Sequence, residues 1–314
     1  MDHSISYANA WLVAVDGARR RIPGYVAVIA AIIALGLSLF GGVALYRAAP
    51  DLTKLVGGET GLALDRLVLF VCSLALLFGA ALISALFERR APMGPQGGAI
   101  QASALGLAFG VLGFLCAFAI AGLFGAIRLG ADVSPWDHRW AGAAIAAILA
   151  LFQVSGEELF FRGWLQPLLG ARWGAWVGLG ATSVLFGAAH AVTGPISVLA
   201  VINDVLAGAV FGLLALRSGG LWAPILAHWG WNWTEQALLG LTPNPGVDPL
   251  GSLFDYDLVG PRLLSGGADE MNGSIAATAS LLALVVLAAL WRSRLEPIWI
   301  KGNSLAQKGS SPIG

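Results

Sequence analysis

Two adjacent carboxylates and a nearby arginine are the first residues whose types and spacing suggest chemistry. Glu157 and Glu158 are followed by Arg162. On a helix, Glu158 and Arg162 are four residues apart and share a face, in the favourable order of acid before base. Glu157 points about 100° away, so Arg162 can hold one carboxylate while the other faces a cavity. Acids in different environments take different proton affinities, which suits acid/base catalysis. A salt bridge at a helix end near the headgroups is the alternative.

A histidine in an apolar stretch forms the second group. His190 follows Phe186 by four residues, and only small residues lie between them. Small residues let another helix approach closely. An imidazole changes charge near neutral pH, so His190 is a candidate water-orienting base or metal ligand. The alternative is a histidine that only packs and donates a hydrogen bond.

His228 and Asn232 form the third group, again four residues apart on one helical face. Two polar groups aimed at one point can donate hydrogen bonds to a developing oxyanion. A hydrogen bond between helices would explain the same pair without catalysis. Asp204 remains open between a cavity-lining residue and an interhelical partner. Glu235 is expected near the outer end of its helix, where it reaches headgroups or water.

The composition indicates what surrounds these groups. Only 11% of the 314 residues are charged and 57% are hydrophobic, with a mean hydropathy of +0.78. A soluble domain carries about 25% charged residues, so the sequence predicts an all-α, polytopic membrane helix bundle. A charge at the bilayer centre costs roughly 2.5–3.5 kcal/mol, which makes the intramembrane ionisable residues functional candidates. The net charge is zero, and we expect no nucleic-acid partner.

Apolar runs of the length that crosses a bilayer predict about eight transmembrane helices. Their ranges are 24–46, 64–87, 99–127, 141–169, 172–192, 196–216, 221–241 and 273–291. Lys and Arg are more numerous in the loops on one side, which predicts both termini in the cytoplasm. The sequence thus divides into a cytoplasmic segment (1–21), three transmembrane helices (22–140), a core (141–241), an extracytoplasmic loop (242–272), a last transmembrane helix (273–291) and a cytoplasmic tail (292–314).

The order of the three groups along the chain resembles the CPBP family of intramembrane proteases. This family includes the type II CAAX prenyl endopeptidases and bacterial relatives linked to bacteriocin processing and immunity. The resemblance rests on Glu-Glu-x-x-x-Arg, Phe-x-x-x-His and His-x-x-x-Asn on successive apolar helices, and it covers about residues 141–241. The helices outside this core match only in hydrophobicity.

The resemblance implies a role for each matching residue. Glu157 would activate water, supported by the Glu158–Arg162 pair. His190 would position or activate the water, while His228 and Asn232 would stabilise the oxyanion.

Metal dependence stays open at this point. Glu157, His190 and His228 are candidate ligands of a divalent metal such as zinc, but the HExxH helix of common zinc proteases is absent. A mechanism driven by glutamate and histidine needs no metal and is slightly favoured.

The sequence therefore predicts an intramembrane endopeptidase in the cell membrane. Its substrate would be a membrane-embedded or lipidated peptide or protein. The lipid bilayer would surround the enzyme. A non-catalytic immunity or scaffold protein of the same fold is the main alternative. A transporter with a proton relay is a second alternative. The confinement of polar residues to the second half of the chain weighs against it.

Overall fold

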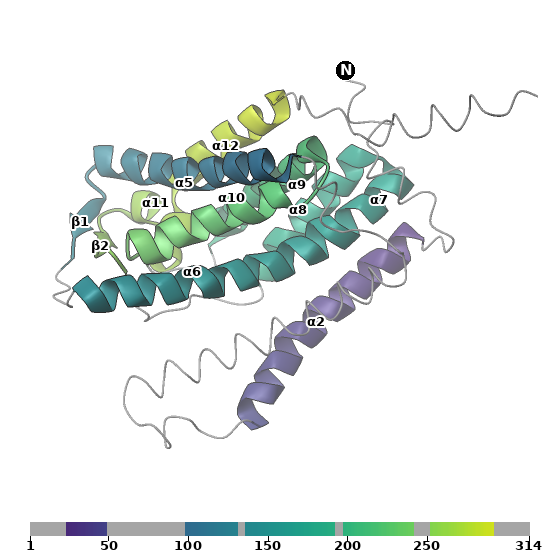
Figure 1. The fold of residues 1–314 in the computed structure, drawn as a ribbon, viewed down its shortest axis with the longest axis horizontal. Coiled ribbons are helices and arrows are strands. Elements are labelled where there is room, and N and C mark those ends of the chain that lie inside the picture. The colour runs from purple at the N-terminus through teal and green to yellow at the C-terminus, as the bar shows by residue number, and fades with distance from the viewer. Residues whose placement is uncertain (1–22, 49–97, 131–135, 192–196, 242–251, 292–314) are drawn as a thin grey trace, which may run out of the picture.

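Helices make up nearly all of the computed structural model, which describes residues 23–48, 98–130, 136–191, 197–241 and 252–291. The expected all-α membrane bundle is confirmed (Figure 1). The predicted span at 64–87 and the two terminal segments lie outside the described residues.

The elements follow one another in a simple order. The α-helices are α2 (Gly24–Ala48), α5 (Ala99–Leu123), α6 (Trp136–Glu158), α7 (Gln166–Trp173), α8 (Ala175–Ala191), α9 (Val198–Ser218), α10 (Trp222–Trp233), α11 (Arg262–Ser265) and α12 (Ile275–Leu290). Two π-helices, η1 (Leu159–Leu165) and η2 (Thr234–Leu238), extend α6 and α10. A 3₁₀-helix, η3 (Gly267–Gly273), precedes α12, and two short strands, β1 (Ile127–Leu129) and β2 (Tyr256–Leu258), pair antiparallel.

Four helical runs among the described residues are long and apolar enough to cross a membrane. They are Ala99–Leu123, Arg139–Trp173, Val198–Ser218 and Gly267–Leu290. The predicted spans at 172–192 and 221–241 correspond to shorter helices, because Gly174 ends α7 with a φ of 93° and α10 gives way to η2. The number of passes and their orientation therefore stay predictions.

Helix α10 lies directly against α5, and the two run side by side in Figure 1. Glycines permit this approach. A Cβ on Gly106 would lie 2.1 Å from the carbonyl oxygen of Ala223, and one on Gly110 would lie 2.1 Å from that of Ala227. Small residues at such a contact are typical of membrane helices, because backbone packing takes over the role that the hydrophobic effect has in water. This contact fixes the position of α10.

The described part of the predicted extracytoplasmic loop folds back onto the bundle. The Asp269 carboxylate accepts a hydrogen bond from the Ser197 backbone N–H at 2.8 Å. The Asn203 amide donates to the Asn272 carbonyl at 2.8 Å, and the Thr278 hydroxyl donates to Asn203 at 2.7 Å. The segment before α12 is thus attached to α9, and it contributes to the pocket described next.

Candidate active site

The two carboxylates of the first group stand where an α-helix changes into a π-helix. Glu157 and Glu158 are the last two residues of α6, and η1 begins at Leu159. A π-helical turn inside an α-helix is rare and is often found at functional sites. The change in winding does not separate the predicted pair, since Arg162 on η1 still reaches back to Glu158.

Glu158 joins an arginine to a histidine inside the bundle. Its Oε1 accepts a hydrogen bond from the Arg162 guanidinium at 2.9 Å and lies 2.9 Å from Nδ1 of His228. Glu158 and Arg162 are fully buried, and His228 is 5% exposed. Buried charges are tolerated when they are paired and hydrogen-bonded. The predicted Glu158–Arg162 pair forms, and His228 is a third member that the sequence did not indicate.

Arg162 has a second anchor on another helix. Its guanidinium donates to the backbone carbonyl of Gly208 at 3.0 Å and lies over the Phe186 ring, 4.6 Å from the ring centre. These contacts tie η1 to α9 and α8. The arginine is therefore held from three sides, and it in turn holds Glu158.

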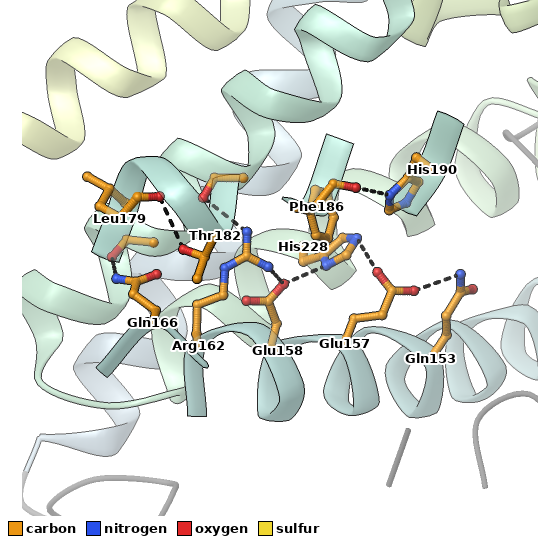
Figure 2. Close-up of polar contacts among 12 residues, drawn as sticks. Gln153, Glu157, Glu158, Arg162, Gln166, Leu179, Thr182, Phe186, His190 and His228 are labelled. Carbon is orange, nitrogen blue, oxygen red and sulfur yellow. Dashed lines mark hydrogen bonds and ion pairs between the residues drawn. The ribbon is translucent and has the colours of Figure 1, made fainter. Parts of the chain in front are cut away.

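Glu157 approaches the opposite nitrogen of the same imidazole. Its Oε2 lies 4.0 Å from Nε2 of His228, and its Oε1 accepts a hydrogen bond from the Gln153 amide at 3.2 Å. Figure 2 shows the His228 ring between the two glutamates, with Gln153 on the outer side of Glu157. The sequence predicted that the two carboxylates would face different surroundings. In the structure they differ in their partners, yet both converge on His228.

Aromatic rings hold the two histidines in place. His228 is stacked on Phe211 at 4.5 Å between ring centres. Phe186 contacts both imidazoles, since its ring centre lies 4.5 Å from that of His190 and 5.8 Å from that of His228. Phe186 therefore spaces the two histidines, which gives the Phe-x-x-x-His pattern a physical reason.

His190 is oriented by its own helix. Its Nδ1 lies 3.0 Å from the carbonyl oxygen of Phe186, one turn earlier on α8. A carbonyl only accepts hydrogen bonds, so we assign the proton to Nδ1. In the neutral ring Nε2 is then the nitrogen that can accept a proton.

A pocket opens beside these groups. Its wall includes Gln153, His190, Asp204, His228, Asn232 and Glu235. It offers about 50 Å³ to the centres of water molecules, and roughly 10–15 Å³ of such space is enough for one. The predicted residues His190, His228 and Asn232 thus line one pocket with room for water, and Glu157 contacts two residues of its wall.

Glu235 differs from its expectation. It was expected to reach headgroups or water, but it is 1% exposed, lines the pocket and accepts hydrogen bonds from the Asn272 amide at 3.3 and 3.4 Å. The segment before α12 accounts for the difference, because it lies over this end of the helix and supplies Asn272 as the partner of Glu235. The spacing of an ordinary α-helix is consistent with this, because Glu235 follows His228 by seven residues and so shares its face.

Asp204 lines the pocket, one of the two roles left open for it. Its neighbour Asn203 makes the hydrogen bonds between helices instead. The Oδ2 of Asp204 is buried and has no hydrogen-bond partner within the described residues. The sequence also gave no sign of Gln153 and Asn272, because amides without a charge do not stand out in an apolar run.

The three candidate metal ligands do not form a metal site. Among the described residues, no group of three or more His, Cys, Asp or Glu side chains is arranged to hold an ion. His228 instead offers Nδ1 to Glu158, and His190 offers Nδ1 to the Phe186 carbonyl. The geometry of Glu157, His190 and His228 therefore does not support the metal site that the sequence left open.

Fold and site together define a class of protein: a membrane helix bundle with a buried carboxylate–imidazole cluster beside a pocket with room for water. The family model described as Type II CAAX prenyl endopeptidase Rce1-like matches residues 139–234. This segment is similar to the Rce1-like family, and the match bears out the predicted resemblance to the CPBP/CAAX proteases over these residues. The match supports CAAX-type intramembrane protease activity at the level of the family.

A curated relative extends the comparison to a second sequence. The "Uncharacterized 24.3 kDa protein" of Escherichia coli is 35% identical over 101 residues, which are 31% of this chain and 43% of that relative. The match thus spans less than half of the relative's length. No solved structure matches the chain.

Proposed function

We propose that this protein is an intramembrane endopeptidase that hydrolyses a peptide bond with water activated by Glu157. The arrangement of two carboxylates on opposite nitrogens of His228, beside a pocket with room for water, is the observation that carries the proposal. Peptide hydrolysis needs a base near the attacking water and donors near the carbonyl oxygen. The residues around this pocket include both kinds of group.

Glu157 is the base in this mechanism. Its Oε2 is buried and accepts no hydrogen bond from the described residues, so it is available for a water molecule. The water loses its proton to this oxygen as it attacks the scissile carbonyl carbon. His190, on the wall of the same pocket, orients the water through Nε2. The proton then passes to the leaving amine as the carbon–nitrogen bond breaks.

His228 and Asn232 stabilise the oxyanion of the tetrahedral intermediate. Both line the pocket and lie one turn apart on α10. The Glu158–Arg162 pair holds Nδ1 of His228, which leaves Nε2 as the nitrogen that donates when it carries a proton. A donor fixed before the reaction stabilises the developing charge without reorganisation at the moment of attack.

The substrate we propose is a membrane-embedded or lipidated peptide, as in CAAX-type processing. The outward faces of the helices are apolar; the exposed side chains Ile148, Phe152, Leu282 and Val286 are examples. A substrate anchored in the bilayer would meet such a site by lateral diffusion. A peptide ending in a prenylated cysteine, two aliphatic residues and a terminal residue is the natural first probe.

The test uses the full chain reconstituted in liposomes. Cleavage is followed by mass spectrometry with the prenylated probe and with the same peptide lacking the prenyl group. Glu157→Gln should lower kcat by at least about 100-fold, the usual contribution of a general base. Asp257→Asn is the matched control, because it removes a carboxylate from an exposed ion pair with Arg128, and its rate should equal that of the wild type.

Three results would count against the proposal. Equal cleavage by Glu157→Gln and the wild type would reject Glu157 as the base. A folded wild-type protein that cleaves neither probe, and no membrane peptide in the same liposomes, would favour the non-catalytic alternative. Substrate-driven proton flux in these liposomes would point to a transporter.

A further inference from the structure

Gln153 lies one helical turn before Glu157 and belongs to none of the three sequence groups. Its amide nitrogen donates a hydrogen bond to Oε1 of Glu157 at 3.2 Å, and its side chain is part of the pocket wall. Figure 2 shows the Gln153 amide and the His228 ring on either side of the Glu157 carboxylate. Gln153 is thus the outermost member of the polar chain that runs through Glu157 and His228 to Glu158.

The contact with Gln153 distinguishes the two oxygens of Glu157. Oε1 is occupied by the amide, whereas Oε2 faces Nε2 of His228 at 4.0 Å and has no hydrogen bond within the described part of the chain. The terminal torsion of a glutamate is soft and nearly two-fold, so a carboxylate without such a contact rotates readily. A donor on one oxygen fixes the plane of the carboxylate and leaves a defined oxygen for a proton.

We propose that Gln153 is a positioning residue that selects Oε2 of Glu157 as the oxygen that takes the proton from water. The inference rests on the proposed function and adds to it a residue outside the family-like motifs. Gln153 acts through Glu157, since its amide nitrogen is engaged with that carboxylate. Its loss should lower the rate of the chemical step and leave substrate binding unchanged.

The separation of kcat from KM distinguishes positioning from packing or substrate binding. An interaction made only in the transition state lowers kcat, whereas one that binds substrate raises KM. Gln153→Met keeps the length of the side chain and removes the donor. Gln153→Glu keeps the shape, removes the donor and places a second carboxylate beside Glu157.

The experiment measures kcat and KM of the full chain in liposomes with the probe cleaved by the wild type. Gln153→Met should lower kcat about tenfold or more, the effect of losing one hydrogen bond to a charged group, with KM within about twofold. The kcat of Gln153→Glu should fall by at least the same factor. Gln101→Met is the matched control, because Gln101 is exposed on α5, and its constants should equal those of the wild type.

The results that would reject the role of Gln153 differ from the result that would reject the proposed endopeptidase function. A kcat that is unchanged in both variants, or a KM that rises at constant kcat, overturns the positioning role. If Gln153→Met unfolds, the isosteric Gln153→Glu carries the test, and a third variant, Gln153→His, restores a donor and should recover part of the rate. A wild type that cleaves no peptide refutes the proposed function before any variant is compared.

Discussion

Helix α10 makes two interfaces of opposite character. Toward α5 the contact is dry and close, with Gly106 and Gly110 against the backbone of α10. Toward α6 and η1 the contact is polar, with His228 between two carboxylates. The first interface is marked by close backbone contact at small residues, and the second by buried polar side chains. The comparison suggests that α5 sets the depth and angle of α10, and that the polar residues depend on this placement.

The two interfaces also differ in what holds them. Small-residue packing tolerates no added atoms, because the backbones are already in contact. The polar interface depends on each buried charge keeping its partner, because an unpaired charge inside the bundle is costly. Substitutions at the two interfaces should therefore fail for different reasons, and the following predictions test this difference.

The largest expected effect is the loss of the buried arginine. Arg162→Met should lower the free energy of unfolding by about 3–5 kcal/mol, because it leaves the Glu158 carboxylate buried without its cation. The measurement is an unfolding titration with SDS in detergent micelles. The double variant Glu158→Leu/Arg162→Met should regain part of this loss, since it buries no lone charge.

The control for this prediction is an ion pair of the opposite kind. Arg128 and Asp257 join the two short strands, and their side chains are 68% and 43% exposed. Arg128→Met should change the unfolding free energy by no more than about 1 kcal/mol, as exposed pairs contribute little. Equal losses at Arg162 and Arg128 would contradict the view that burial makes the inner pair essential.

Asn232 separates chemistry from stability within the polar interface. Asn232→Ala should lower kcat by about 10²–10³, the range for removing one oxyanion donor. Its side chain is half-buried at the pocket wall, so the unfolding free energy should stay close to that of the wild type. Kinetics and SDS titration on the same preparation check both parts. A variant that loses stability and activity together would make Asn232 a structural residue.

Sequence patterns predicted which residues lie at the polar interface better than they predicted the contacts between those residues. Glu158 and Arg162 were paired correctly because four residues bring two side chains together on a helix, and η1 preserves that contact. The bond from His228 to Glu158 joins residues 70 positions apart, and no local spacing encodes it. Glu235 was placed wrongly, because the distant segment that covers it and supplies Asn272 as its partner is not visible in local spacing.

For the fold as well, the sequence predicted the properties of single segments but not the contacts between distant ones. Hydropathy identified a membrane bundle, since apolar length is a property of each segment alone. The attachment of η3 to α9 through Asn203 and Asn272 depends on distant residues that meet only in the folded chain. The same is true of the glycine contacts between α5 and α10, which read in the sequence as ordinary apolar helix.

Gly110 offers the corresponding test of the dry interface. A Cβ at this position would lie 2.1 Å from the Ala227 carbonyl oxygen and 2.8 Å from the Trp231 backbone nitrogen. Gly110→Ala must push α10 away, and we expect a loss of about 1–3 kcal/mol in the unfolding free energy, the usual cost of overpacking. Because α10 carries His228, kcat should fall as well, although no polar group has been changed.

Gly180 is the matched control for this substitution. It lies on α8, where an added Cβ meets no atom within 4 Å. Gly180→Ala should leave kcat unchanged and should be neutral or slightly stabilising, since alanine favours a helix over glycine by up to about 1 kcal/mol. If Gly110→Ala loses stability but keeps the full kcat, the polar residues hold their geometry without support from α5. The dry interface would then stabilise the fold and take no part in arranging the site.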